Sequence, residues 1–190
     1  RLVTNLYGTL KRTIKAFGVP PAELGGQFPE LAHRLMPPSF SSVWSSRKRL
    51  MGLTKARLRE VRSGPVLEEI HEPPELMKLP CLTCWPLDGG PFFTLPLVHT
   101  TDPENGVGNL GIYRLQRYDD TTTGMHWQIE KGGGFHFKKA CAMGKPLPIS
   151  VFLGGPPALT IAAITALPEG IDERLLAALM IGKPLDVILR

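Results

Sequence analysis

From Val66 onward, proline, glycine and aspartate divide the chain into short apolar runs of strand length. The whole sequence holds 20 glycines and 19 prolines among 190 residues. Because proline cannot donate a backbone hydrogen bond and glycine weakens the interior of a helix or strand, this punctuation keeps each element short. The pattern predicts strands at residues 66–70, 92–99, 108–116, 125–129, 147–153 and 184–189, the fifth of them buried.

Helices are expected before the first of these strands and again after the fourth. Thr9 can cap a helix that continues to Phe17 and stops at Gly18. Further helices are predicted to begin near residues 20–21 and to span 55–62, 136–143, 158–165 and 173–181. Short strands with helices grouped after them favour an α+β fold over a doubly wound parallel sheet.

Composition narrows the class of protein. The chain is 43% apolar and 21% charged, and it contains no run of 18 apolar residues that could span a membrane. Three cysteines without a secretory signal indicate a reducing cytoplasm. The sequence starts abruptly at Arg1 and stops at Arg190, apparently within a strand, so we expect a piece of a longer polypeptide.

The formal net charge is +5, and basic residues are concentrated in one region: Arg47, Lys48, Arg49, Lys55, Arg57, Arg59 and Arg62. No zinc-finger, recognition-helix or RNA-binding motif accompanies this region, and aromatic residues are not interleaved with it. A solvated helix face or a contact between subunits is therefore favoured over a nucleic-acid interface.

Two short motifs have a functional and a structural interpretation. Cys81 and Cys84 have the spacing of half a zinc site, but only Cys141 remains as a further cysteine, so partly buried thiols are favoured. The glycine run at residues 132–134, next to Lys131, could cradle a phosphate through its backbone N–H groups or could simply form a turn. The sequence leaves this second choice open.

Residues 109–114 (Asn-Leu-Gly-Ile-Tyr-Arg) form a strand-like segment that begins with an amide and ends with a guanidinium. Alternate side chains of a strand face opposite ways, so Asn109 and Arg114 could meet at one ligand only across a bend. Gly111 could supply that bend. Asn109 and the later Glu173 are hard oxygen donors suited to Mg²⁺ or Mn²⁺, and Arg114 suits a phosphate or carboxylate.

The same segment, with residues 101–106 before it, resembles the signature of the UbiD family of prenylated-flavin-dependent decarboxylases. Further blocks agree in order and spacing at residues 3–8, 85–92, 126–128, 154–158 and 167–173. The resemblance extends along the whole chain.

The resemblance implies a flavin-binding split β-barrel with flanking helices over residues 65–190. It implies that residues 1–64 form a helical lead-in from a missing N-terminal region. The implied reaction is reversible, non-oxidative decarboxylation of an aromatic or α,β-unsaturated carboxylic acid. Prenylated FMN and Mn²⁺ are the implied cofactors, with K⁺ as a further candidate ion. The implied partners are a small-molecule acid and a second copy or another subunit, without nucleic acid or a membrane span.

Site residues follow from the family pattern position by position. Asn109 and Glu173 match metal ligands, and Arg114 matches the catalytic arginine. Glu130 stands where relatives often carry a histidine ligand, and its carboxylate can also bind a hard cation. The positions that match flavin contacts are Ile112, Tyr113, Arg114, His126, Trp127, Gln128, Lys131 and Gly132.

One part of the family's catalytic apparatus lies beyond this sequence. The acidic segment that supplies the proton in the family follows the position of Arg190. An alternative from another class is therefore a non-catalytic flavin-binding or assembly subunit that completes a site with a partner chain.

Overall fold

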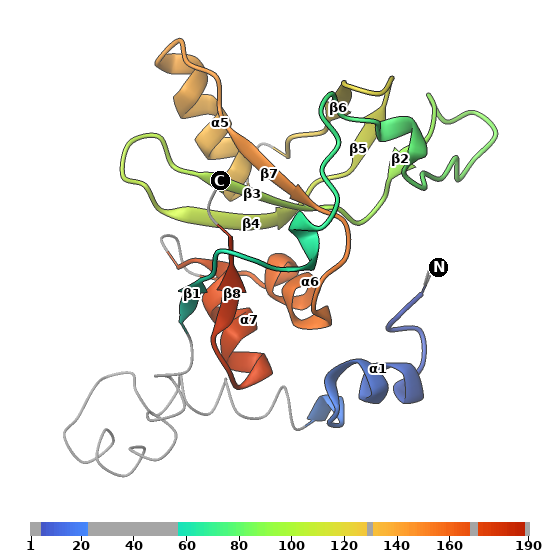
Figure 1. The fold of residues 1–190 in the computed structure, drawn as a ribbon, viewed down its shortest axis with the longest axis vertical. Coiled ribbons are helices and arrows are strands. Elements are labelled where there is room, and N and C mark those ends of the chain that lie inside the picture. Colours follow the sequence, from blue (N-terminus) through green and yellow to red (C-terminus); the bar gives the residue numbers. More distant parts are fainter. Residues whose placement is uncertain (1–4, 23–56, 129–130, 168–170, 189–190) are drawn as a thin grey trace. The chain divides into compact units, whose positions relative to one another are not determined.

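The computed structural model describes residues 5–22, 57–128, 131–167 and 171–188 (Figure 1). The chain divides into two compact units. The first comprises Arg1–Arg59 and Leu175–Leu185, and the second comprises Glu60–Arg174 and Asp186–Arg190. In the described part of the chain, no helix combines the length and the apolar character needed to cross a membrane.

The first unit contains α1 (Leu10–Phe17), which confirms the predicted helix and both of its ends. The Thr9 side chain accepts a hydrogen bond from the Arg12 N–H at 3.3 Å, satisfying a donor that the first turn leaves open. Gly18 ends the helix with φ 78°, a left-handed conformation that glycine adopts without strain. Most of the helix expected from residues 20–21 lies outside the described residues.

Two antiparallel three-stranded sheets form the second unit. In one, β3 (Leu97–Thr101) lies between β4 (Gly108–Ile112) and β7 (Ile149–Phe152), with Val98 opposite both Gly111 and Val151. In the other, β5 (Leu115–Arg117) lies between β2 (Phe92–Phe93) and β6 (Thr123–Met125). The described strands form no closed barrel, so the split barrel stays a prediction.

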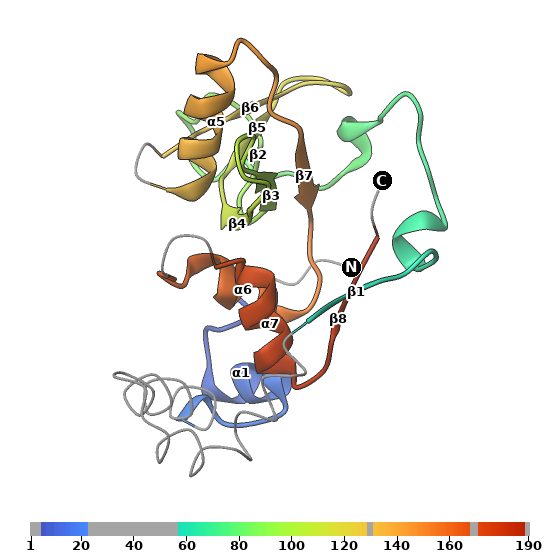
Figure 2. The same cartoon turned by 90° about the vertical axis from the view of Figure 1, so that its left-hand side faces the viewer.

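Helices α5 (Gly132–Ala142) and α6 (Pro157–Ile164) both pack against β3 and β4. They approach β4 from opposite directions, α5 from above and α6 from below in Figures 1 and 2. The buried core joins the two sheets through Phe93, Val98, Tyr113 and Leu115. Burial of these apolar side chains stabilises the arrangement by about 25 cal/mol for each Å² removed from water.

One further helix and two further strands belong to the described part. Helix α7 (Glu173–Ile181) has the predicted bounds, and α6 lies within one residue of its prediction. Strand β1 (Leu58–Glu60) pairs with β8 (Leu185–Val187). The sequence predicts a polar helix over 55–62, but the described residues of this range contain strand β1 instead.

Other predicted elements differ from the structure for identifiable reasons. The strand expected at 66–70 is a 3₁₀ turn, η1 (Pro65–Leu67), because Pro65 has the φ of a helical first residue and cannot join a ladder. The run 92–99 is divided into β2 and β3 around buried Pro96, which lacks the N–H that a continuous strand would donate. A second 3₁₀ turn, η2 (Leu76–Lys78), follows η1.

Strand β7 forms within the run 147–153, but all four of its residues are exposed rather than buried. It pairs only with β3 in the described part, so it lies at the edge of its sheet. An apolar run of this length is typical of a buried strand, and the packing around it decides the actual exposure.

Candidate functional site

A cavity of about 370 Å³ in the second unit lies between β4, the start of α5 and the segment after α6. Its polar lining includes Asn109, Tyr113, Lys131, Gly132, His136 and Glu173. Ala163, Ile164, Leu167 and Ile171 add an apolar wall. The cavity therefore combines an apolar surface with a small set of convergent polar groups, which is typical of a ligand site.

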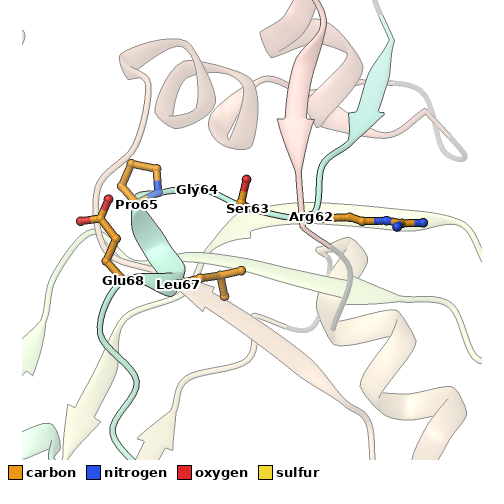
Figure 3. A pocket seen from close by; sticks show the side chains of 6 residues that line it. All are labelled: Arg62, Ser63, Gly64, Pro65, Leu67 and Glu68. Atoms are coloured by element: carbon orange, nitrogen blue, oxygen red, sulfur yellow. The ribbon is translucent and has the colours of Figure 1, made fainter.

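A second cavity, of about 500 Å³, contains none of the predicted site residues (Figure 3). It is lined by Arg62, Ser63, Gly64, Pro65, Leu67 and Glu68. The Arg62 side chain extends away from Pro65 and Glu68 in Figure 3, so the charged groups do not converge on one point. The first cavity is the better candidate.

The chain changes sheets between Asn109 and Arg114. Strand β4 ends at Ile112, and β5 begins at Leu115 in the other sheet. The bend expected at Gly111 is therefore wrong, because Gly111 stays in register opposite Val98. A Cβ at Gly111 would lie 2.5 Å from the Tyr113 ring, so this glycine provides space for the ring.

The change of sheet separates the two ends of the segment. Asn109 lines the cavity, whereas Arg114 is exposed and does not line it. The Arg114 guanidinium carbon lies 5.1 Å from the centre of the Phe92 ring, a cation–π contact. This contact keeps the cation on the side of the β2–β5–β6 sheet.

Asn109 presents an unused amide nitrogen. Its Nδ2 is buried and has no hydrogen-bond partner among the described residues. Its Oδ1 lies so close to the Gly132 backbone that a Cβ at Gly132 would overlap it. Because buried polar groups normally have partners, an unpaired amide in a cavity wall fits a ligand site.

Glu173, the first residue of α7, lies beside Asn109. Its Oε2 accepts a hydrogen bond of 2.7 Å from the backbone N–H of Leu110 in β4. Burial raises the pKa of the Glu173 carboxyl, and the nearby charge of Asp172 adds to this effect. A bound cation would favour the ionised carboxylate, so the two oxygen donors fit a hard metal ion.

Tyr113 connects β4 to the start of α5. It is buried, and its hydroxyl accepts a hydrogen bond of 3.0 Å from the Gly133 N–H. Burial raises the pKa of Tyr113, which keeps the phenol neutral. Its ring contacts Trp127 at 5.0 Å between centroids, and Trp127 stacks on Phe137 at 5.6 Å. These three rings form an aromatic wall, of which Tyr113 lines the cavity.

Of the remaining predicted residues, Lys131 and Gly132 line the cavity, whereas Ile112, His126 and Gln128 do not. Ile112 is half-buried at the end of β4, and His126 and Gln128 are exposed. Lys131 occupies the N-cap position of α5, which begins at Gly132. Glu130 lies outside the described residues, so its role as a metal ligand stays a prediction. Within the described ranges, no three His, Cys, Asp or Glu residues form a group that could hold a metal ion.

The cysteines are placed largely as expected. All three are free. Cys81 packs partly buried against the core, and this burial raises the pKa of its thiol. Cys84 is exposed rather than partly buried.

His136 lies at the site although no sequence pattern predicts it there. It lines the cavity and is 8% exposed, with its Nδ1 2.9 Å from the Thr100 hydroxyl. Asp102 lies beyond it and forms an ion pair of 2.7 Å with Lys139. These residues come from β3, the following turn and α5, so no short spacing motif could identify them.

Comparison with known sequences places this site in a family. Residues 59–189 match the family model described as "UbiD: 3-octaprenyl-4-hydroxybenzoate carboxy-lyase Rift-related domain". One subunit of a 4-hydroxybenzoate decarboxylase of Chlamydia pneumoniae is 43% identical over 190 residues, which cover 97% of this chain and 31% of that protein. A protein of Chlamydia muridarum is 46% identical over 189 residues, which cover 98% of this chain and 32% of that protein. The chain thus spans about a third of the length of these relatives.

Solved structures agree with the sequence relatives. The closed form of Sedimentibacter hydroxybenzoicus vanillic acid decarboxylase has a TM-score of 0.77 and 26% identity, covering 100% of this chain and 38% of that one. The UbiD-class enzyme HmfF from Pelotomaculum thermopropionicum, in an evolved dimeric form in complex with prenylated FMN, has a TM-score of 0.74 and 27% identity, with 95% and 38% covered. The protein belongs to the UbiD family, and its described residues have a mixed α/β fold similar to that of these enzymes.

Proposed function

We propose that this chain is the cofactor-binding portion of a decarboxylase that uses prenylated FMN. The reaction is reversible, non-oxidative removal of CO₂ from an aromatic or α,β-unsaturated carboxylic acid. The observation that carries this proposal is the pairing of Asn109 and Glu173 in one cavity of a UbiD-family chain. The HmfF complex supports the choice of cofactor, because that structurally similar enzyme is in complex with prenylated FMN.

Asn109 and Glu173 would hold a hard cation, for which Mn²⁺ is the proposed ion and K⁺ a further candidate. A phosphate monoester carries up to two negative charges, so its binding needs compensating positive charge. Lys131 and the first turn of α5 lie in the same cavity wall, and the N-terminus of a helix favours an anion. Glu130 remains a proposed third ligand.

The other proposed contacts would be made to the flavin and to its substrate. When bound, the prenylated flavin supplies the electron sink for loss of CO₂. Arg114 would hold the substrate carboxylate, because its guanidinium stays charged near neutral pH. Ile112, Tyr113 and Trp127 would exclude water from the flavin, while His126 and Gln128 would donate polar contacts at its edge.

Residues 65–190 are proposed to belong to a flavin-binding split barrel, with residues 1–64 as its helical lead-in. The remainder of the protein would supply the general acid. The three cysteines are free, which accords with a cytoplasmic location.

A non-catalytic subunit is the second candidate. The Chlamydia pneumoniae relative supports assembly with a partner chain, because that protein is named as one subunit of a decarboxylase. The intact mass of the natural protein separates the two candidates. A mass near 20.9 kDa, that of these 190 residues, favours a subunit, and a much larger chain favours the enzyme.

The test of the main proposal is Glu173→Gln in the full-length protein. This change keeps the shape of the side chain and removes its charge, so Mn²⁺ and flavin should be lost together. Bound Mn²⁺ is measured by electron paramagnetic resonance and flavin by absorbance. Glu69→Gln, at an exposed position, is the matched control and should retain both. Full occupancy in Glu173→Gln would contradict the assignment.

A further inference from the structure

The two neighbours of Glu173 in the sequence are bound to each other. The Arg174 Nε lies 3.0 Å from both carboxylate oxygens of Asp172, and Nη2 lies 2.6 Å from Oδ2. The backbone N–H of Arg174 also donates to Asp172 Oδ1 at 2.9 Å. The side chains of Arg174 and Asp172 are only 19% and 14% exposed. We name this ion pair the 172–174 clamp.

The clamp constrains the backbone at Glu173. Asp172 directly precedes α7 and accepts the N–H of the second helical residue, as an N-cap does. The Arg174 guanidinium also donates charge-assisted hydrogen bonds to the Asp172 carboxylate, so these two residues are linked a second time. Since Glu173 lies between the linked residues, its φ and ψ angles and the direction of its side chain are held from both sides.

The clamp rests on Gly108 of β4. A Cβ at Gly108 would lie 2.7 Å from Asp172 Oδ2, 2.8 Å from Arg174 Nη2 and 2.8 Å from His99 Nε2. Gly108 has no left-handed φ, so its backbone does not require glycine. Glycine is required because of the limited space, since any side chain at this position would have to displace the clamp.

The same strand contacts Glu173 itself. Two residues after Gly108, the Leu110 N–H donates to Glu173 Oε2 at 2.7 Å. Strand β4 therefore contacts the clamp at Gly108 and donates a hydrogen bond to Glu173 from Leu110. Asn109 is the residue between these two in the sequence. Asp172 and Arg174 carry opposite charges, so the clamp has no net charge.

We infer that Asp172 and Arg174 are positioning residues that aim the Glu173 carboxylate at the metal ion, and that Gly108 makes room for them. This inference rests on the proposed function, which makes Glu173 a ligand. Groups that orient a metal ligand typically change metal affinity by roughly 10–100-fold when they are removed.

Mn²⁺ titration of the full-length protein tests the inference, with binding followed by electron paramagnetic resonance. Arg174→Ala and Gly108→Ala should each weaken Mn²⁺ binding by roughly 10–100-fold, although Glu173 is intact. Arg174→Lys should recover part of the affinity, because an ammonium keeps the charge but lacks the planar fork. A purely structural defect would instead lower the melting temperature without rescue by lysine.

Gly64→Ala is the matched control for the glycine change. Gly64, shown in Figure 3, has an extended backbone with φ 174°, and a Cβ there would meet only Ile188 Cδ1, at 3.5 Å. Its Mn²⁺ affinity should equal that of the parent protein. If Arg174→Ala does not fold, the charge-free pair Asp172→Asn with Arg174→Gln replaces it, with the same expected loss.

The outcomes separate this inference from the proposed function. If Glu173→Gln loses Mn²⁺ while Arg174→Ala and Gly108→Ala bind it like the parent protein, the clamp has no positioning role and the proposed function stands. If Glu173→Gln retains Mn²⁺, the proposed metal site and the inference are both overturned.

Discussion

At the scale of single residues, glycines shape the candidate site because they have no side chain. Gly108 leaves room for the 172–174 clamp, Gly111 for the Tyr113 ring, and Gly132 for the Asn109 amide. At each position a Cβ would meet a side chain at or below 2.8 Å, which is closer than van der Waals contact allows. The three glycines that make this space lie in β4 and at the start of α5.

His99 gives the first residue-scale prediction, on pH dependence. Its Nε2 is buried without a partner among the described residues, and burial, followed by the charge of Arg174, lowers its pKa from 6.5 to about 4. The unfolded chain therefore binds this proton near pH 6.5 and the folded chain only near pH 4. The free energy of unfolding should fall as the pH is lowered through this window, by roughly 1–3 kcal/mol.

The measurement is urea unfolding of the full-length protein at a series of pH values across this window, for the parent protein and for His99→Gln. The variant should lose this part of the acid-side slope, because glutamine does not titrate. An unchanged slope in His99→Gln would show that another group is responsible.

At the scale of elements, α5 begins earlier than its composition suggests. The sequence predicts its start at His136, but the helix begins at Gly132 and includes three consecutive glycines. Glycine is about 1 kcal/mol worse than alanine in a helix, so propensity opposes this first turn. Glycine is used here because a Cβ at Gly132 or Gly133 would overlap Asn109, Tyr113 or Trp127.

The second prediction concerns Gly133→Ala. A Cβ there would lie 2.7 Å from Trp127 Cζ3 and 2.9 Å from the Tyr113 hydroxyl, which is buried and hydrogen-bonded to the same residue. The change should therefore destabilise the protein by about 1–3 kcal/mol, against the usual gain from alanine in a helix. Thermal and urea unfolding measure the effect.

Ala142→Gly, at the exposed end of α5, provides the comparison. It should cost no more than about 1 kcal/mol, since only helix propensity changes there. A Gly133→Ala protein as stable as the parent would mean that the aromatic wall adjusts freely.

At the scale of the whole molecule, cofactor binding and turnover are expected to separate. The chain spans about a third of the length of its relatives. The proton donor is expected to lie outside these residues. The 190-residue chain should bind flavin yet release no CO₂, because general acid catalysis is worth on the order of 10²–10⁴ in rate. Assays of CO₂ release and of H/D exchange measure this.

Restoring the complete protein should restore activity, and Arg114→Ala in that protein should abolish it again. The guanidinium of Arg114 cannot itself act as the acid, because it stays protonated near neutral pH. Full turnover by the short chain would locate the acid within it, with Glu130 and Asp88 as candidates.

The sequence by itself determined those features whose causes lie within a few neighbouring residues. Thr9 and Gly18 predicted both ends of α1, and the apolar run after Asp172 predicted the bounds of α7. The motif at 109–114 identified the family, which the match over residues 59–189 confirms. Caps, stops and motifs act locally, so they can be read without knowledge of the fold.

Only the tertiary structure decided which distant residues share a surface. It divided the run 108–116 between two sheets, placed Arg114 outside the cavity that Asn109 lines, and brought His99 and Gly108 together at the 172–174 clamp. It also placed the glycine run of residues 132–134 in the first turn of α5. Each outcome depends on a packing partner far away in the sequence, and no local pattern encodes the identity of that partner.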